Sequence, residues 1–117
     1  MVKRFSIGLG VVLMGIGLWG IATGGYAHEL VIFGVNAGHN VVHVVSGGLA
    51  ILAGMSGTRA ATIFCLAFGA VYGFVSLAGF FHLRPAVHLL NLNTADNFLH
   101  LGIAVACLWV GGSSKAS

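Results

Sequence analysis

Residues 36–54 read NAGHNVVHVVSGGLAILAG, a short polar opening followed by a long apolar run. Residues 93–111 read NTADNFLHLGIAVACLWVG and repeat this arrangement 57 positions later. The first opening has the pattern N-x-x-H-N-x-x-H and the second has N-x-x-D-N-x-x-H, so only one polar position differs. A helix needs about 20 apolar residues to cross a membrane. Both segments therefore indicate membrane-spanning helices that open with polar residues.

Four such segments occupy most of the 117 residues. The chain is 58% apolar and only 6% charged, whereas soluble domains carry about 25% charged residues. This excludes a soluble globular protein, a disordered chain and a nucleic-acid binder. A transmembrane β-barrel needs strands in which polar and apolar residues alternate, and the sequence shows no sustained alternation of this kind. We expect an all-α, four-helix transmembrane bundle, a single integral domain over 1–117 in contact with the lipid bilayer. Its expected spans are 5–24, 33–54, 61–81 and 94–111.

The repeat predicts how the spans are arranged. Each unit is a two-helix hairpin, so two parallel repeats related by an axis along the membrane normal are expected. Lys3, Arg4, Arg59 and Lys115 fall on one side of the membrane, and Arg84 alone falls on the other. The excess of cations places both termini in the cytoplasm. We expect a multi-pass protein of a bacterial inner membrane or a photosynthetic membrane.

The repeated motif places ionisable side chains inside two spans. His39 and His43 are four residues apart and share one helix face, as do Asp96 and His100. If the second and fourth spans face each other, His39 pairs with Asp96 in one layer and His43 with His100 in the next. Ionisable groups inside a span are costly unless paired, and they are a functional-site hypothesis by default.

One interpretation of this cluster is purely structural. Asn36 and Asn93 are suitable N-caps, and the charge of Asp96 suits a helix N-terminus. Asn40 and Asn97 lie one residue further round each helix, toward neighbouring helices. Hydrogen bonds of this kind hold membrane helices together. The structural polar network then comprises Asn36, Asn40, Asn93 and Asn97.

The other interpretation is a ligand site, in three versions. His39, His43, Asp96 and His100 form a three-histidine, one-carboxylate set that suits zinc or another transition metal. Alternatively, His43 and His100 ligate a haem iron from both sides, or a single histidine holds the magnesium of a chlorophyll. The expected cofactor is thus a transition metal, haem or chlorophyll.

The remaining motifs are few. No phosphate-binding loop, dinucleotide fingerprint, nucleophile elbow or H-E-x-x-H motif occurs, so an enzyme is not expected. Cys65 and Cys107 are expected to be small buried apolar residues rather than a disulfide. Ser6, Ser46 and Ser76 are expected to bond to their own helices. Glycine patterns that allow close helix packing, such as Gly69-x-x-x-Gly73, are expected to occur by chance in a chain with 19 glycines, so they carry little weight.

The polar motifs also carry a resemblance. The pattern Asn36-x-x-His39-Asn40-x-x-His43, then Gly47, Tyr72-Gly73 and Asp96-Asn97-x-x-His100, resembles a family of small bacterial membrane proteins described as domain of unknown function 4383. The resemblance covers nearly the whole chain and implies a four-span topology without a mechanism.

Small size, short connections and absent catalytic motifs favour a non-enzymatic role. We expect an accessory or assembly subunit of a larger membrane complex, for example an energy-transducing or photosynthetic one. Its partners would be other membrane subunits or further copies of itself. Two alternatives are a metal- or haem-binding protein in metal handling or electron transfer, and a small proton-coupled transporter that uses Asp96.

Overall fold

Four long helices make up most of the part of the chain that the structure describes. The computed structural model describes residues 1–23, 28–30, 33–84, 87 and 90–114. The helices are α1 (Val2–Ala22), α2 (Ala37–Ser56), α3 (Thr58–Phe80) and α5 (Thr94–Ser113). Each has 20–23 residues, about 30–35 Å at 1.5 Å per residue, which matches the hydrocarbon core of a bilayer. All four are also apolar enough to cross it. The predicted four-helix membrane bundle is confirmed.

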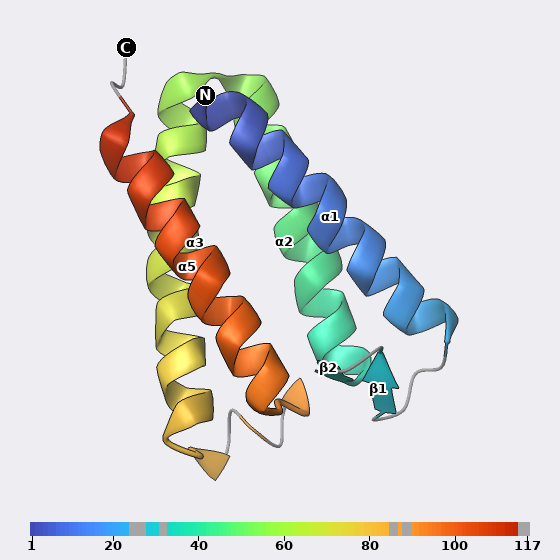
Figure 1. Cartoon of the computed structure of the whole chain (residues 1–117). Coiled ribbons are helices and arrows are strands. Elements are labelled where there is room, and N and C mark those ends of the chain that lie inside the picture. The colour runs from blue at the N-terminus through green and yellow to red at the C-terminus, as the bar shows by residue number, and fades with distance from the viewer. Residues whose placement is uncertain (24–27, 31–32, 85–86, 88–89, 115–117) are drawn as a thin grey trace.

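Helices α1 and α3 run in one direction, and α2 and α5 return in the other (Figure 1). The N-terminus therefore lies at the same end as the α2–α3 turn and the end of α5. The turn is tight because Gly57, with φ of 138°, adopts a backbone conformation that side chains disfavour. The parallel arrangement of the two repeats, and the two-fold axis that would relate them, stay predictions.

The connection between α1 and α2 contains a feature that the sequence did not predict. A short antiparallel ribbon pairs β1 (His28–Leu30) with β2 (Phe33–Val35). The expected second span, 33–54, therefore begins too early, and α2 starts only at Ala37. The reason is Asn36, whose extended backbone prevents the helix from beginning earlier and whose side chain caps its N-terminus. The other helix ends differ from the expected ones by three residues or fewer.

Each helix packs mainly against its neighbour in a hairpin, α1 against α2 and α3 against α5. Glycines make the first hairpin close. A Cβ atom added at Gly10 would lie 2.5 Å from the carbonyl oxygen of Gly47, and one added at Gly47 would lie 2.6 Å from that of Gly10. The backbones of α1 and α2 therefore touch directly.

Buried serines join the same pairs of helices. The Ser6 hydroxyl donates to the Ala50 carbonyl of α2 at 2.6 Å, and the Ser76 hydroxyl donates to the Asn97 carbonyl of α5 at 2.9 Å. The expectation that these serines bond to their own helices is wrong. Where helices approach so closely, a short hydroxyl reaches the neighbouring backbone instead.

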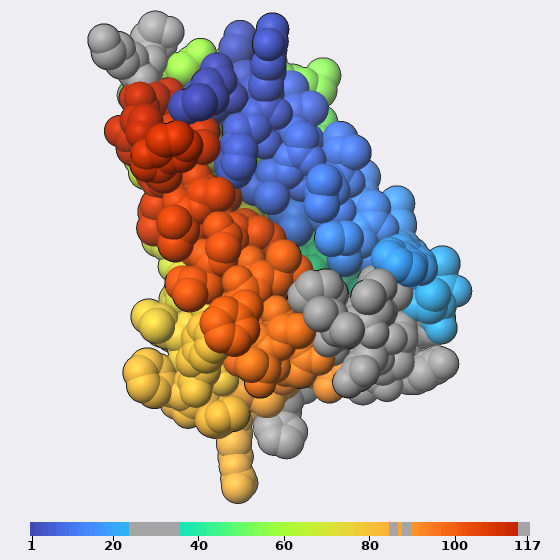
Figure 2. All heavy atoms as spheres, viewed as in Figure 1, coloured from blue at the N-terminus to red at the C-terminus, as the bar shows by residue number. Residues whose placement is uncertain are grey.

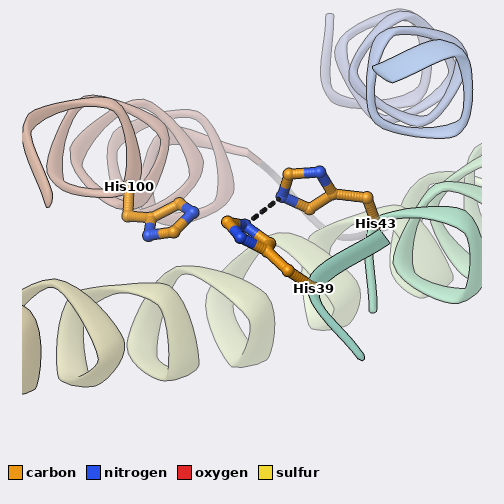
Figure 3. A group of neighbouring side chains, drawn as sticks. All are labelled: His39, His43 and His100. Carbon is orange, nitrogen blue, oxygen red and sulfur yellow. Dashed lines mark hydrogen bonds between the residues drawn. The ribbon is translucent and has the colours of Figure 1, made fainter. Parts of the chain in front are cut away.

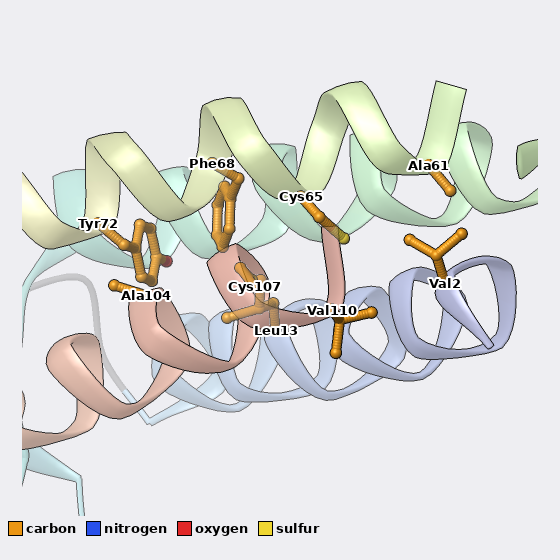
Figure 4. Packing of buried hydrophobic residues seen from close by; sticks show 9 residues of the cluster. All are labelled: Val2, Leu13, Ala61, Cys65, Phe68, Tyr72, Ala104, Cys107 and Val110. Atoms are coloured by element: carbon orange, nitrogen blue, oxygen red, sulfur yellow. The ribbon is translucent and has the colours of Figure 1, made fainter. Parts of the chain in front are cut away.

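The apolar core fills one half of the bundle. It contains Val2, Leu13, Ala61, Cys65, Phe68, Tyr72, Ala104, Cys107 and Val110 (Figure 4). Both cysteines are fully buried and free, as expected from the sequence. Large apolar side chains elsewhere point outward, as the lipid-facing surface of a membrane protein requires. Figure 2 shows α1 and α5 covering one face, with little of α2 visible between them.

Candidate metal centre

Three histidines meet at the end of the bundle opposite the α2–α3 turn. His39 and His43 lie in the first two turns of α2, and His100 lies in the second turn of α5. Their exposed fractions are 1%, 3% and 2%. The helix starts are fixed by caps, so the backbones that present these rings are well defined. The structure therefore places three imidazoles from two different hairpins in one buried group.

The rings are close enough to act together. The Nε2 atoms of His39 and His43 lie 3.1 Å apart, within hydrogen-bond distance. Ring centroids are separated by 4.4 Å for His39–His43, 5.5 Å for His39–His100 and 6.2 Å for His43–His100. One nitrogen from each ring can be chosen so that all three lie within 4.8 Å of one another. Figure 3 shows the His39 ring lying between the other two.

This arrangement differs from the expected two layers. His39 was expected beside Asp96, with His43 and His100 forming a separate pair. Instead, the His39 ring is closer to His100 than the His43 ring is. The three imidazoles form a triangle because one helical turn on α2 brings both of its histidines toward the same residue of α5.

Asp96 lies outside the histidine group and caps α5. Its carboxylate accepts the backbone N–H of Asn93 at 2.9 Å, and the Asn93 side chain accepts the backbone N–H of Asp96 at the same distance. This reciprocal pair is a capping box. At α2, the Asn36 side chain accepts the N–H of His39 at 2.8 Å. Both asparagines are N-caps, and Asp96 is buried in that role.

The other two motif asparagines lie inside the hairpins. Asn40 is fully buried against Gly20 of α1, and Asn97 is 4% exposed against Gly79 of α3. A Cβ atom at either glycine would collide with the amide of its asparagine. The structural polar network thus divides into two helix caps and two interhelical contacts, at equivalent places in the two hairpins.

Tyr72 is a neighbour of the histidines that was not predicted as part of the site. Its ring meets His100 edge to face with centroids 5.0 Å apart. Tyr72 also continues a row of rings along α3, with Phe64 and Phe68 at successive four-residue steps. That spacing is visible in the sequence. A tyrosine deep in an apolar span usually has a polar neighbour for its hydroxyl, so Tyr72 could have been predicted as a site residue.

An apolar crevice of about 300 Å³ opens between α2 and α3 and reaches the histidines. We call it the α2–α3 crevice. His39 and His100 lie at one end of it. Its other lining residues are Val42, Ser46, Leu49, Phe64, Ala67, Phe68, Val71, Tyr72, Val75 and Leu90.

The outer nitrogens of two of the three imidazoles lie in apolar surroundings. The buried Nδ1 atoms of His43 and His100 have no hydrogen-bond partner there. A neutral imidazole offers one donor and one acceptor, so the close His39–His43 contact requires opposite roles at the two Nε2 atoms. Grouped imidazoles suit zinc, copper or nickel, and three ligands leave a coordination position open.

The comparisons with known proteins agree with the resemblance drawn from the sequence. The family model described as "Domain of unknown function (DUF4383)" matches residues 3–112. The chain therefore belongs to this family. No curated protein and no solved structure matches the chain.

Proposed function

We propose that this member of the DUF4383 family is a non-enzymatic membrane protein that binds one divalent transition-metal ion, in the first place zinc. The ligands are His39, His43 and His100. The observation that carries the proposal is the convergence of three buried imidazoles whose ligand atoms lie within 4.8 Å of one another. In a tetrahedral zinc site such nitrogens are about 3.3 Å apart. The group therefore needs to contract by about 1.5 Å at most to enclose an ion.

The membrane setting supports an ion at this place. Polar side chains inside a span are costly unless they are paired. Within the described residues, the His43 ring has one hydrogen-bond partner, the Nε2 atom of His39, and its Nδ1 atom has none. A bound cation would give the His43 and His100 rings, whose Nδ1 atoms lack a hydrogen-bond partner among the described residues, a strong ligand bond.

A single ion fits the geometry better than a haem does. A haem held between His43 and His100 needs a flat space separating those two rings. The His39 ring lies there, within hydrogen-bond distance of His43 (Figure 3). The capping bond to Asn93 uses one oxygen of the Asp96 carboxylate, and a carboxylate has a second oxygen that could bind a metal. The three histidines are the proposed ligands because they are the set that the structure already brings together.

The position of the ligands suggests what the ion does. Two come from α2 in the first hairpin and one comes from α5 in the second. Since most helix packing occurs within each hairpin, the ion acts as a brace between the hairpins. Metal binding to a site that exists only in the folded state stabilises that state.

We further propose an accessory or assembly role in a larger complex of a bacterial inner membrane, with both termini cytoplasmic. The short connections and absent catalytic motifs support this role. Purification in a native detergent should give a stoichiometric membrane partner or a defined homo-oligomer. A lone monomer would contradict the proposal. A proton-coupled carrier gains less support, because its candidate residue, Asp96, serves as a helix cap.

Metal content after purification tests the metal site. We expect about one zinc ion per chain in the wild-type protein, and at least tenfold weaker binding in His43→Ala and His100→Ala, since each removes one of three ligands. His82→Asn is the matched control. His82 is an exposed histidine with φ of 54°, and asparagine tolerates that conformation.

His100→Gln separates loss of a ligand from loss of fold, because it keeps a polar side chain of similar size. It should retain the helical circular dichroism of the wild type and still lose zinc. If the three histidine variants keep their metal while folded, the site is elsewhere and the proposal is wrong.

A further inference from the structure

We propose that the α2–α3 crevice binds a neutral, quinone-type lipid, with a flat carbonyl-bearing ring near Tyr72 and an apolar chain along α2. This goes beyond metal binding and does not require the ion. It rests on the shape and lining of the crevice and on two buried polar groups at one end. Small-molecule sites are typically apolar clefts of about 300–1,000 Å³ with a few placed polar groups.

The lining selects against a charged ligand. Among the described residues that line the crevice there is no Lys, Arg, Asp or Glu. A fatty-acid carboxylate or a phosphate head would enter this apolar region without a fixed counter-charge, which is costly. A neutral head group avoids that cost.

Two polar groups at the histidine end lack partners within the described structure. The Tyr72 hydroxyl and the His100 Nδ1 atom are buried and have no hydrogen-bond partner there. Both residues are more than nine-tenths buried and both line the crevice. Tyrosine is a hydrogen-bond donor, and a carbonyl oxygen is the acceptor that a neutral lipid head can offer. Both atoms have almost no accessible surface, so a small rotation of these side chains has to open them to a head group at this end of the crevice.

The wall beside these groups is aromatic. Phe64 and Phe68 are stacked with centroids 4.9 Å apart, and Phe68 and Tyr72 are 4.0 Å apart. Aromatic faces favour offset stacking or edge contacts with another flat ring. A planar quinone head matches this wall better than a branched or bulky head does.

The crevice is also elongated. It extends along one face of α2 from His39 to Leu49, about 15 Å at the rise of an α-helix. Its α2 lining beyond His39 is Val42, Ser46 and Leu49, so away from the histidines it is apolar apart from the Ser46 hydroxyl. A single hydrocarbon tail extending from the head group matches this length and polarity.

Binding of a decyl-substituted benzoquinone to the purified full-length protein tests the proposal. Calorimetric titration in detergent with a metal chelator present should show saturable binding. Ala67→Phe should weaken it at least tenfold, because Ala67 lines the crevice. Ala70→Phe is the matched control, since Ala70 lies on the same helix, is exposed and does not line the crevice. It should bind as the wild type does.

Tyr72→Phe tests the head group without changing the shape of the crevice. It should weaken quinone binding about fivefold to tenfold, the effect of one lost hydrogen bond, and leave decylbenzene unaffected. Equal binding of decylbenzene or decanoate to the wild type would overturn the assignment of a carbonyl head. If Ala67→Phe binds the quinone as tightly as the wild type does, the crevice is not the binding site. The same conclusion follows if the quinone only partitions into the detergent and binding does not saturate.

Discussion

Asn93 and Asp96 illustrate how single residues shape this protein. Each side chain accepts the backbone N–H of the other at 2.9 Å, which satisfies two groups that a helix start leaves unpaired. The same motif in α2 has His39 in place of Asp96 and retains only the asparagine cap. One substitution between the repeats therefore converts a capping residue into a member of the histidine group.

This capping role gives a prediction for Asp96. Asp96→Ala should lower the free energy of unfolding by about 1 kcal/mol, since the carboxylate bond to Asn93 is lost. Asp96→Asn should retain most of that stability because its amide oxygen can still accept the bond. Reversible unfolding in mixed micelles measures both. An equal loss in the two variants would show that the charge of Asp96, rather than its capping oxygen, is needed.

The sequence predicted some of these residue roles and missed others. The spacing N-x-x-H and N-x-x-D predicted both caps, because an N-cap acts on the residues directly after it. The spacing also brought His39 and His43 onto one face. The involvement of Tyr72 was not predicted, since it depends on how α3 is rotated against α5. No local pattern specifies that rotation.

At the scale of helices, glycines recur every seventh residue. Gly47 and Gly54 follow Asn40 along α2, and Gly10 and Gly17 are seven residues apart on α1. Gly10 faces Gly47, and Gly17 packs against the backbone of Asn40. The G-x-x-x-G patterns noted in the sequence indicate the contact between α1 and α2 less well than this seven-residue repeat does. A stripe of that period keeps one face of each helix in contact. It explains why α1 and α2 approach until their backbones touch.

Gly10 and Gly8 provide a matched test of this packing on one helix. A Cβ atom at Gly10 would collide with the backbone of α2, whereas one at Gly8 meets nothing within 4 Å. Gly10→Ala should therefore cost about 1–3 kcal/mol of stability, and Gly8→Ala should change it little. The thermal midpoint in detergent distinguishes them. Equal midpoints would mean that α1 and α2 are not in direct backbone contact.

The elements themselves were largely predictable. Apolar length alone predicts four spans, because only about 20 such residues cross a bilayer. The ribbon of β1 and β2 was not predicted, since three-residue strands leave too short a pattern to recognise. Span 2 was placed too early for the same reason, as the apolar residues of β2 adjoin the helix.

At the scale of the whole molecule, the two ends of α3 test the orientation in the membrane. Arg59 lies near the start of α3 and Arg84 lies beyond its end, and both are exposed. Intact cells carrying Arg84→Cys should react with a membrane-impermeant maleimide, while Arg59→Cys should react only after lysis. The two native cysteines are buried and should stay silent. The opposite labelling pattern would place the termini outside. Lys115, which also entered this prediction, lies outside the described residues.

The histidine group links the two hairpins, and the whole-molecule account depends on it. Its members come from positions 39, 43 and 100, so only the folded bundle brings them together. The sequence supplied the candidates, and the structure shows that the three histidines among them meet, whereas the role of Asp96 as a ligand stays a prediction. If a metal joins the hairpins here, removing it should loosen the bundle as a whole.

X-ray absorption at the zinc edge of the zinc-loaded protein tests this account most directly. Three imidazole ligands predict a shell of nitrogen scatterers at about 2.0–2.1 Å with the outer pattern typical of histidine rings. His100→Ala should reduce that pattern by a third or abolish binding, and His82→Asn should leave it unchanged. A sulfur shell at about 2.3 Å would instead assign the metal to the cysteines. That result, or a protein that takes up no metal, would contradict the three-histidine centre.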